Sequence, residues 1–202
     1  MSDTHTSARA EAGPRPGTLV ILLFISTLGM MGGVAIQPVI EVIRQSLGVG
    51  GTAGGLVLTA HGLAVAVASP LIGRLTDRVG PRLPLAAGLA VFGLAGGAGL
   101  FVDSYPALIA SRLLLGVGIA AVFTCSTAAL LAAYSGAERD RVMGWRTTAF
   151  TVGGVIYPLA AGALGNLSWH APFAVYLIGL PLGAALLYTL PPGRPAGAGA
   201  EG

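Results

Sequence analysis

Six apolar stretches of about 19 to 27 residues dominate this chain of 202 residues, and each is long enough for a helix to cross a hydrocarbon core of about 30 Å. They cover residues 18–40, 51–72, 84–102, 107–133, 143–165 and 172–190. Only 9% of the residues are charged, whereas a soluble domain has about 25%. Because lipid cannot satisfy backbone polar groups, we predict an all-α integral membrane protein with six transmembrane helices.

The arginines predict which ends of these helices face the cytoplasm. Nine of the eleven basic residues, all arginine, fall on one side of the predicted topology: Arg9, Arg15, Arg74, Arg78, Arg82, Arg139, Arg141, Arg146 and Arg194. Only Arg44 lies in a loop on the opposite side, and Arg112 lies inside a stretch. Short cytoplasmic segments collect positive charge, so we expect both termini in the cytoplasm and the protein in the inner (plasma) membrane. Topology also explains the basic pI near 9.5, so we expect no nucleic-acid partner.

The composition divides the chain into three parts. Residues 1–17 are polar and are expected to form a disordered cytoplasmic tail. Residues 18–190 are expected to form one compact bundle, because short connections such as 103–106 and 166–171 force antiparallel neighbours. Residues 191–202 have the Pro, Gly and Ala content of a cytoplasmic linker. The single cysteine, Cys125, leaves no CxxC site, and we expect neither a metal nor a cofactor.

The charged stretch Gly73–Leu83 lies between two apolar stretches, so we predict it as a short aqueous loop. Its pattern, G-x-L-x-D-R-x-G-x-R, resembles the loop between helices two and three of the major facilitator superfamily of secondary transporters, with Pro81 where a basic residue is usual. The resemblance implies that this loop controls gating, and that its Asp locks the cytoplasmic side against a second half of the molecule. The residues concerned are Gly73, Asp77, Arg78, Gly80 and Arg82. A solvated ion pair of Asp77 with Arg74 or Arg78 is the simpler alternative.

Arg112 lies in the fourth stretch, about 9 Å below its outer end, where a charge must face protein or water or else extend toward the surface. The residues around it resemble the family's fourth-helix motif, l-x-x-x-R-x-x-q-G-x-g-a-A, with Leu115 where Gln is usual. The resemblance implies that Arg112 attracts an anionic substrate or stabilises an ionised, proton-carrying carboxylate. No Asp or Glu lies near the middle of any stretch, so the carboxylate of the second role is missing.

The fifth stretch carries small residues at regular intervals. Gly144, Gly153, Pro158 and Gly162 fall at spacings that resemble the G-x8-G-x3-G-P-x2-G-G motif of antiporters, where they imply close helix packing and a bend. Tyr157 replaces one motif glycine, and we expect its ring to prevent the closest backbone contact.

Two polar residues in the first two stretches are further candidates for the solute or proton pathway. Gln37, before Pro38, either faces a cavity or bonds across helices. His61 lies about halfway through the second stretch, where an imidazole could carry a coupling proton. Alternatively, His61 is a polar substitute that is hydrogen-bonded to a neighbour.

The resemblance extends from about residue 18 to residue 190 and is most specific for the N-terminal half of a drug or small-solute efflux transporter. It implies two inverted three-helix repeats, half of a major facilitator fold, and alternating access. It further implies proton-coupled efflux of a small hydrophobic or amphiphilic solute. The partner would be a second six-helix half, either a second copy or a separately encoded chain. A fragment that is inactive, or that acts only in assembly, is the alternative. We expect no enzyme, because Ser126 lacks a G-x-S context and His61 and His170 lie on different helices.

Overall fold

The computed structural model describes residues 16–189, and all regular secondary structure in this range is helical. The elements are α1 (Pro16–Val34), η1 (Gln37–Val39), α2 (Ile40–Ser46), α3 (Gly51–Val79), α4 (Arg82–Gly97), η2 (Ala98–Leu100), α5 (Tyr105–Ala133), α6 (Gly136–Gly165), η3 (Ala171–Ile178) and α7 (Gly179–Thr189). They form six helical segments long and apolar enough to cross a membrane, which confirms the predicted fold class. Apart from the first residues of α1, the two predicted tails lie outside the described residues.

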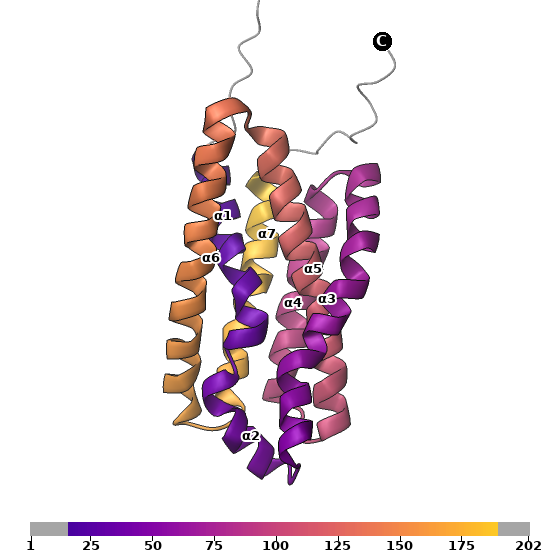
Figure 1. Cartoon of the computed structure of the whole chain (residues 1–202), viewed down its shortest axis with the longest axis vertical. Helices are drawn as coiled ribbons and strands as arrows, with labels where there is room; N and C mark the ends of the chain where they lie inside the picture. The colour runs from indigo at the N-terminus through magenta and orange to yellow at the C-terminus, as the bar shows by residue number, and fades with distance from the viewer. Residues whose placement is uncertain (1–15, 190–202) are drawn as a thin grey trace, which may run out of the picture.

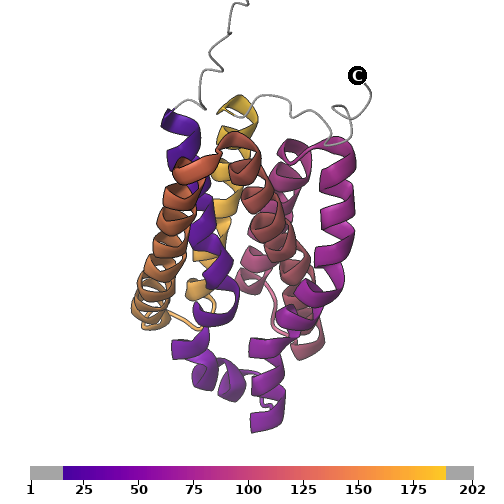
Figure 2. The same cartoon turned by 45° about the horizontal axis from the view of Figure 1, so that its top comes forward.

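The six spans form a bundle with α5 at its centre. Figures 1 and 2 show α1 passing between α6 and α5, with α3 and α6 at opposite edges and α4 and α7 behind. The pairing of α3 with α5 is matched by the pairing of α6 with α1, as two inverted repeats, α1-α3-α4 and α5-α6-α7, require. Of the six spans, α3 and α6 are the least buried.

The first and last spans meet at one end of the bundle. Thr18, near the start of α1, donates a hydrogen bond from its hydroxyl group to the backbone carbonyl of Thr189, the last residue of α7, at 3.4 Å. An even number of antiparallel spans places the start of the first and the end of the last at the same end of the bundle, which makes this contact possible.

The predicted loop over Gly73–Leu83 is wrong in its extent. The helix α3 continues to Val79, so most of the charged stretch is helical, and only Gly80 and Pro81 connect it to α4. A helix of 29 residues is about 44 Å long and extends beyond the hydrocarbon core, which lets its last turns carry charge in water. Gly80 ends the helix with a φ of 80°, and its N–H donates to the carbonyl of Thr76 at 2.8 Å.

A related correction applies to the three arginines counted on the cytoplasmic side next to the fifth span. The helix α6 begins at Gly136, which has a φ of 54°, so Arg139, Arg141 and Arg146 are helical residues and not loop residues. Arg146 is therefore about 15 Å into a helix, which removes it from the set of arginines that predict topology.

The first span is interrupted near its C-terminal end. Pro38 has no N–H to donate to the carbonyl four residues earlier, and α1 ends at that residue, Val34. The chain continues through the 3-10 turn η1 into the short helix α2, so the α-helix of the first span is broken just before Pro38.

Candidate functional site

Arg112 on α5 is enclosed by protein, as its depth in the span predicts. Its side chain has no exposed surface, and its Nη2 donates to the carbonyl of Gly96 at 3.1 Å. The guanidinium carbon lies 4.9 Å from the ring centroid of Phe173 and 5.1 Å from that of Tyr176. Within residues 16–189 no carboxylate pairs with it, and its Nε and Nη1 have no partner. Arg112 is thus a caged cation that does not extend toward the surface.

Gly96 of α4 and Gly99 of η2 let the two aromatic rings close over Arg112. A Cβ at Gly96 would come within 2.5 Å of Tyr176, and one at Gly99 would overlap the ring of Phe173. The hydroxyl group of Tyr176 donates to the carbonyl of Met31, near the end of α1, at 3.3 Å. Phe173 and Tyr176, which form the cage, therefore connect the buried guanidinium group to the last turn of α1, which ends at Val34.

His61 on α3 lies where three helices meet. A Cβ at Gly33 of α1 would lie 3.4 Å from its Nε2, and a Cβ at Gly116 of α5 would overlap its backbone carbonyl. The imidazole is half-buried, and its Nδ1 has no hydrogen-bond partner among the described residues. The ionisable imidazole therefore lies beside Gly32 and Gly33 of α1. Gln37 is exposed, and no hydrogen bond from its side chain to another helix occurs in the same range.

Arg146 on α6 is missed by the sequence analysis, which counts it with the cytoplasmic arginines although the fifth stretch, 143–165, contains it. Its side chain is 8% exposed, and its guanidinium carbon lies 4.6 Å from the ring centroid of Phe123 on α5. Its Nη2 donates to the carbonyl of Phe123 at 3.4 Å, while its Nε has no partner in the described part of the chain. The available signal is its position inside the apolar stretch 143–165, where a charged side chain is a candidate functional residue.

The ring of Phe123 that lies beside Arg146 forms an aromatic pair with Phe150 against α1. The rings of Phe123 and Phe150 pack edge to face at 6.2 Å between centroids. A Cβ at Gly29 of α1 would lie 3.0 Å from Phe150 and 3.6 Å from Phe123. Residues of α1, α5 and α6 are therefore in contact around one glycine, and Phe123 remains 46% exposed.

The charged end of α3 carries the predicted gating residues. Asp77 and Arg78 are exposed, and the predicted local ion pair of Asp77 is not found within residues 16–189. Arg82 donates through its Nη2 to the carbonyl of Leu187 and so connects the start of α4 to α7. Gly73 has open space around it, and Gly80 forms the turn.

A buried polar contact between α3 and α5 lies next to these residues. The hydroxyl group of Thr76 is 3.1 Å from the thiol of Cys125, and both side chains are buried. Cys125 therefore helps to fix α3 against α5.

The glycines of α6 make unequal contacts. A Cβ at Gly153 would overlap the carbonyl of Thr27, so α6 and α1 touch through their backbones. One turn later, the hydroxyl group of Tyr157 lies 2.6 Å from that of Thr27. The expectation that the Tyr157 ring prevents close contact is wrong, because Gly153 maintains it. A Cβ at Gly162 would be 3.6 Å from Pro38, whereas Gly144 has nothing within 4 Å. Pro158 lies inside the helix.

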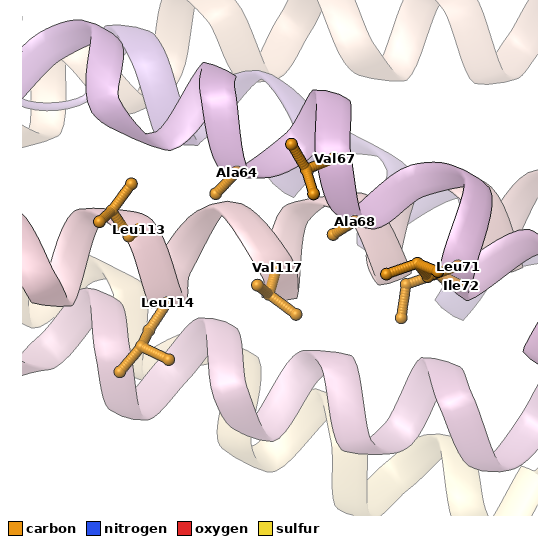
Figure 3. Close-up of a pocket in the computed structure, with 8 residues that line it drawn as sticks. All are labelled: Ala64, Val67, Ala68, Leu71, Ile72, Leu113, Leu114 and Val117. Atoms are coloured by element: carbon orange, nitrogen blue, oxygen red, sulfur yellow. The ribbon is translucent and has the colours of Figure 1, made fainter.

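An apolar groove runs along the surface where α3 packs against α5 (Figure 3). It has a volume of about 360 Å³ and is lined by Ala64, Val67, Ala68, Leu71, Ile72, Leu113, Leu114 and Val117. A ligand site normally combines apolar walls with a few polar groups that orient the ligand, and these eight side chains offer none. No group of three or more metal-ligating side chains occurs among residues 16–189.

Comparisons with known proteins agree with this architecture. The sequence profile of the Major Facilitator Superfamily matches residues 19–202. The chain is 28% identical over 174 residues to the probable L-galactonate transporter of Escherichia coli K12, covering 84% of this chain and 38% of that protein. It is 28% identical over 176 residues to multidrug resistance protein 1 of Bacillus subtilis, with 86% and 44% covered. It is 32% identical over 178 residues to the class C tetracycline resistance protein of Escherichia coli, with 81% and 42% covered. The chain spans less than half the length of these relatives.

Proposed function

Since the chain belongs to the Major Facilitator Superfamily, we propose that it forms the N-terminal six-helix half of a secondary active transporter. The observation that carries this proposal is the family match over the whole bundle, together with the pairing of α3 on α5 and α6 on α1. In this proposal α1 and α5 line a central solute pathway, and the bundle moves against a second half to open it to each side in turn.

A second six-helix half completes the pathway in our proposal. The exposed apolar side chains of the edge helices support it, and Leu63 of α3 and Leu159 of α6 are each more than two-thirds exposed. The free carboxylate of Asp77 would meet this half at the cytoplasmic face, with Arg78 and Arg82 beside it, and would hold that face closed. The second half is a second copy, a separate chain, or further sequence of the same protein.

The proposed activity is efflux of a small hydrophobic or amphiphilic solute coupled to protons. The names of the multidrug and tetracycline resistance relatives support efflux. His61 is the proposed proton carrier, because it is the ionisable group near the middle of α3 and its Nδ1 lacks a partner in the described range. We place the protein in the inner membrane with both chain ends in the cytoplasm, as the arginine distribution supports.

An enzymatic activity is not part of this proposal. Ser126, the serine considered as a nucleophile, donates its hydroxyl group to the carbonyl of Phe123 at 3.4 Å. A nucleophilic serine requires a base in hydrogen-bond reach, and no such contact with a histidine occurs in the part of the chain that the structure describes.

Flux measurements test this function directly. The full chain is reconstituted in liposomes with a pH gradient, and tetracycline or ethidium is added from one side. We expect solute-dependent proton flux that is lost in Asp77→Asn and Arg112→Ala but kept in Arg141→Gln, an exposed arginine on α6. A folded dimer without flux for either solute would contradict a pathway completed by a second copy, and a folded monomer without flux would favour either the inactive fragment or a second half outside this chain.

A further inference from the structure

The interior of the bundle carries two arginines without counter-ions in the described range. Arg112 and Arg146 are both at least nine-tenths buried. The carboxylates of residues 16–189 lie toward the ends of the spans: Glu41, Asp77, Asp103, Glu138 and Asp140. Glu41 pairs with Arg44 at 2.5 Å, and Asp103 with His170 at 3.0 Å. Burying a cation without a counter-ion in a membrane protein costs free energy, so such a residue is by default a candidate for a functional role.

The two arginines differ in what can reach them. Arg112 has no exposed surface and is enclosed by Phe173 and Tyr176 behind α5. Arg146 retains some exposed surface, and the ring that supports it, Phe123, is 46% exposed. Arg146 therefore borders the exposed surface at Phe123, whereas Arg112 would first have to leave its cage.

The surroundings of Arg146 combine a cation with flat apolar surface. Phe123 and Phe150 meet edge to face, and both rings rest against Gly29, which has no side chain to cover them. The Nε of Arg146 is a buried donor without a partner in the described residues. Guanidinium groups bind carboxylates and phosphates through paired N–H donors, and aromatic rings pack against flat apolar groups.

We propose that Arg146, Phe123 and Phe150 form an anion-selective subsite of the solute pathway. The solute then carries a carboxylate or a similar negative group that is attached to a flat apolar part. The negative group pairs with Arg146 and supplies the missing counter-ion, while the apolar part lies on the two rings. This inference rests on the proposed transport function and names the class of solute that the pathway selects.

Probes that differ only in charge test the inference on the wild-type protein. We would measure binding of 2-naphthoate and of its neutral amide, 2-naphthamide, to the full chain in nanodiscs by equilibrium dialysis, with binding to empty nanodiscs subtracted. We expect 2-naphthoate to bind about ten- to a hundredfold more tightly, as expected for one charge-assisted hydrogen bond in a site of low polarity. Equal affinities, or no measurable binding of 2-naphthoate, would overturn the inference.

Three variants locate the site. Arg146→Gln should remove the preference for 2-naphthoate, whereas Arg146→Lys, which keeps the charge, should restore most of it. Arg141→Gln, which removes an exposed charge five residues earlier on α6, should leave the preference unchanged. A preference that persists in Arg146→Gln, or that Arg141→Gln also removes, would contradict the assignment.

Failure of the inference is distinguishable from failure of the transport function. Flux of ethidium, a cation, without binding of 2-naphthoate would leave transport intact and refute the anionic subsite. Charge-selective binding of 2-naphthoate without flux of any solute would establish the subsite and refute transport by this chain alone.

Discussion

The hydroxyl groups of Thr27 on α1 and Tyr157 on α6 lie 2.6 Å apart, one turn from the point where Gly153 touches the backbone of Thr27. Tyr157 stands where the antiporter motif has a glycine, and it is buried. At this position a tyrosine that forms a hydrogen bond to α1 takes the place of the motif's glycine. The nearby Gly153 keeps the two helix backbones in contact.

Removing this hydrogen bond should weaken the bundle measurably. We expect Tyr157→Phe and Thr27→Val each to lower the free energy of unfolding by about 1 kcal/mol. The double variant should cost little more than either single one, because both changes remove the same interaction. Unfolding in detergent micelles measures these values, and Thr147→Val, which removes a hydroxyl group bonded only within α6, is the control. Strictly additive losses would show that the two hydroxyl groups do not interact.

Adding a methyl group at the backbone contacts should be more damaging. Gly116→Ala and Gly153→Ala would push a Cβ into the carbonyls of His61 and Thr27, and we expect each to cost about 1 to 3 kcal/mol of stability. Gly62→Ala is the matched control, because nothing lies within 4 Å of its Cβ position. If all three variants unfold at the same temperature, the close packing described here is wrong.

The fold was largely predictable, because hydrophobic length alone defines spans in lipid. The ends of the helices are less predictable. The charges of Asp77 and Arg78 predict a loop, whereas α3 continues as far as Val79 and is capped by Gly80. Gly80 followed by Pro81 was the available stop signal. The position of Arg112 indicated its burial, but its aromatic cage depends on Phe173 and Tyr176, about sixty residues later in the chain, and only tertiary structure brings them together.

Replacing Arg112 by lysine should not be a conservative change. A guanidinium group can stack on the rings of Phe173 and Tyr176 while it bonds the carbonyl of Gly96, and an ammonium group cannot do both. We expect Arg112→Lys to lower stability by about 1 to 2 kcal/mol. Unfolding of the variant in the same micelles would measure this loss, and full stability would show that the cage needs only a positive charge.

The thiol of Cys125 should report on the packing of α3 against α5. It is fully buried and in contact with Thr76, so we expect maleimide to modify it slowly in the folded protein and rapidly in denaturing detergent. Mass spectrometry of the labelled chain over time measures both rates. Equal rates in the two conditions would mean that the α3-α5 interface opens freely.

Every proposed role depends on which end of the bundle faces the cytoplasm. The direct measurement is labelling with a membrane-impermeant maleimide in a Cys125→Ala background. It uses Arg141→Cys at one end and Leu167→Cys, in the connection after α6, at the other. We predict that in intact cells only Leu167→Cys is labelled, and that in inside-out vesicles only Arg141→Cys is labelled. Labelling of Arg141→Cys from outside intact cells would contradict the orientation, and with it the gating role of Asp77 and the proposed direction of transport.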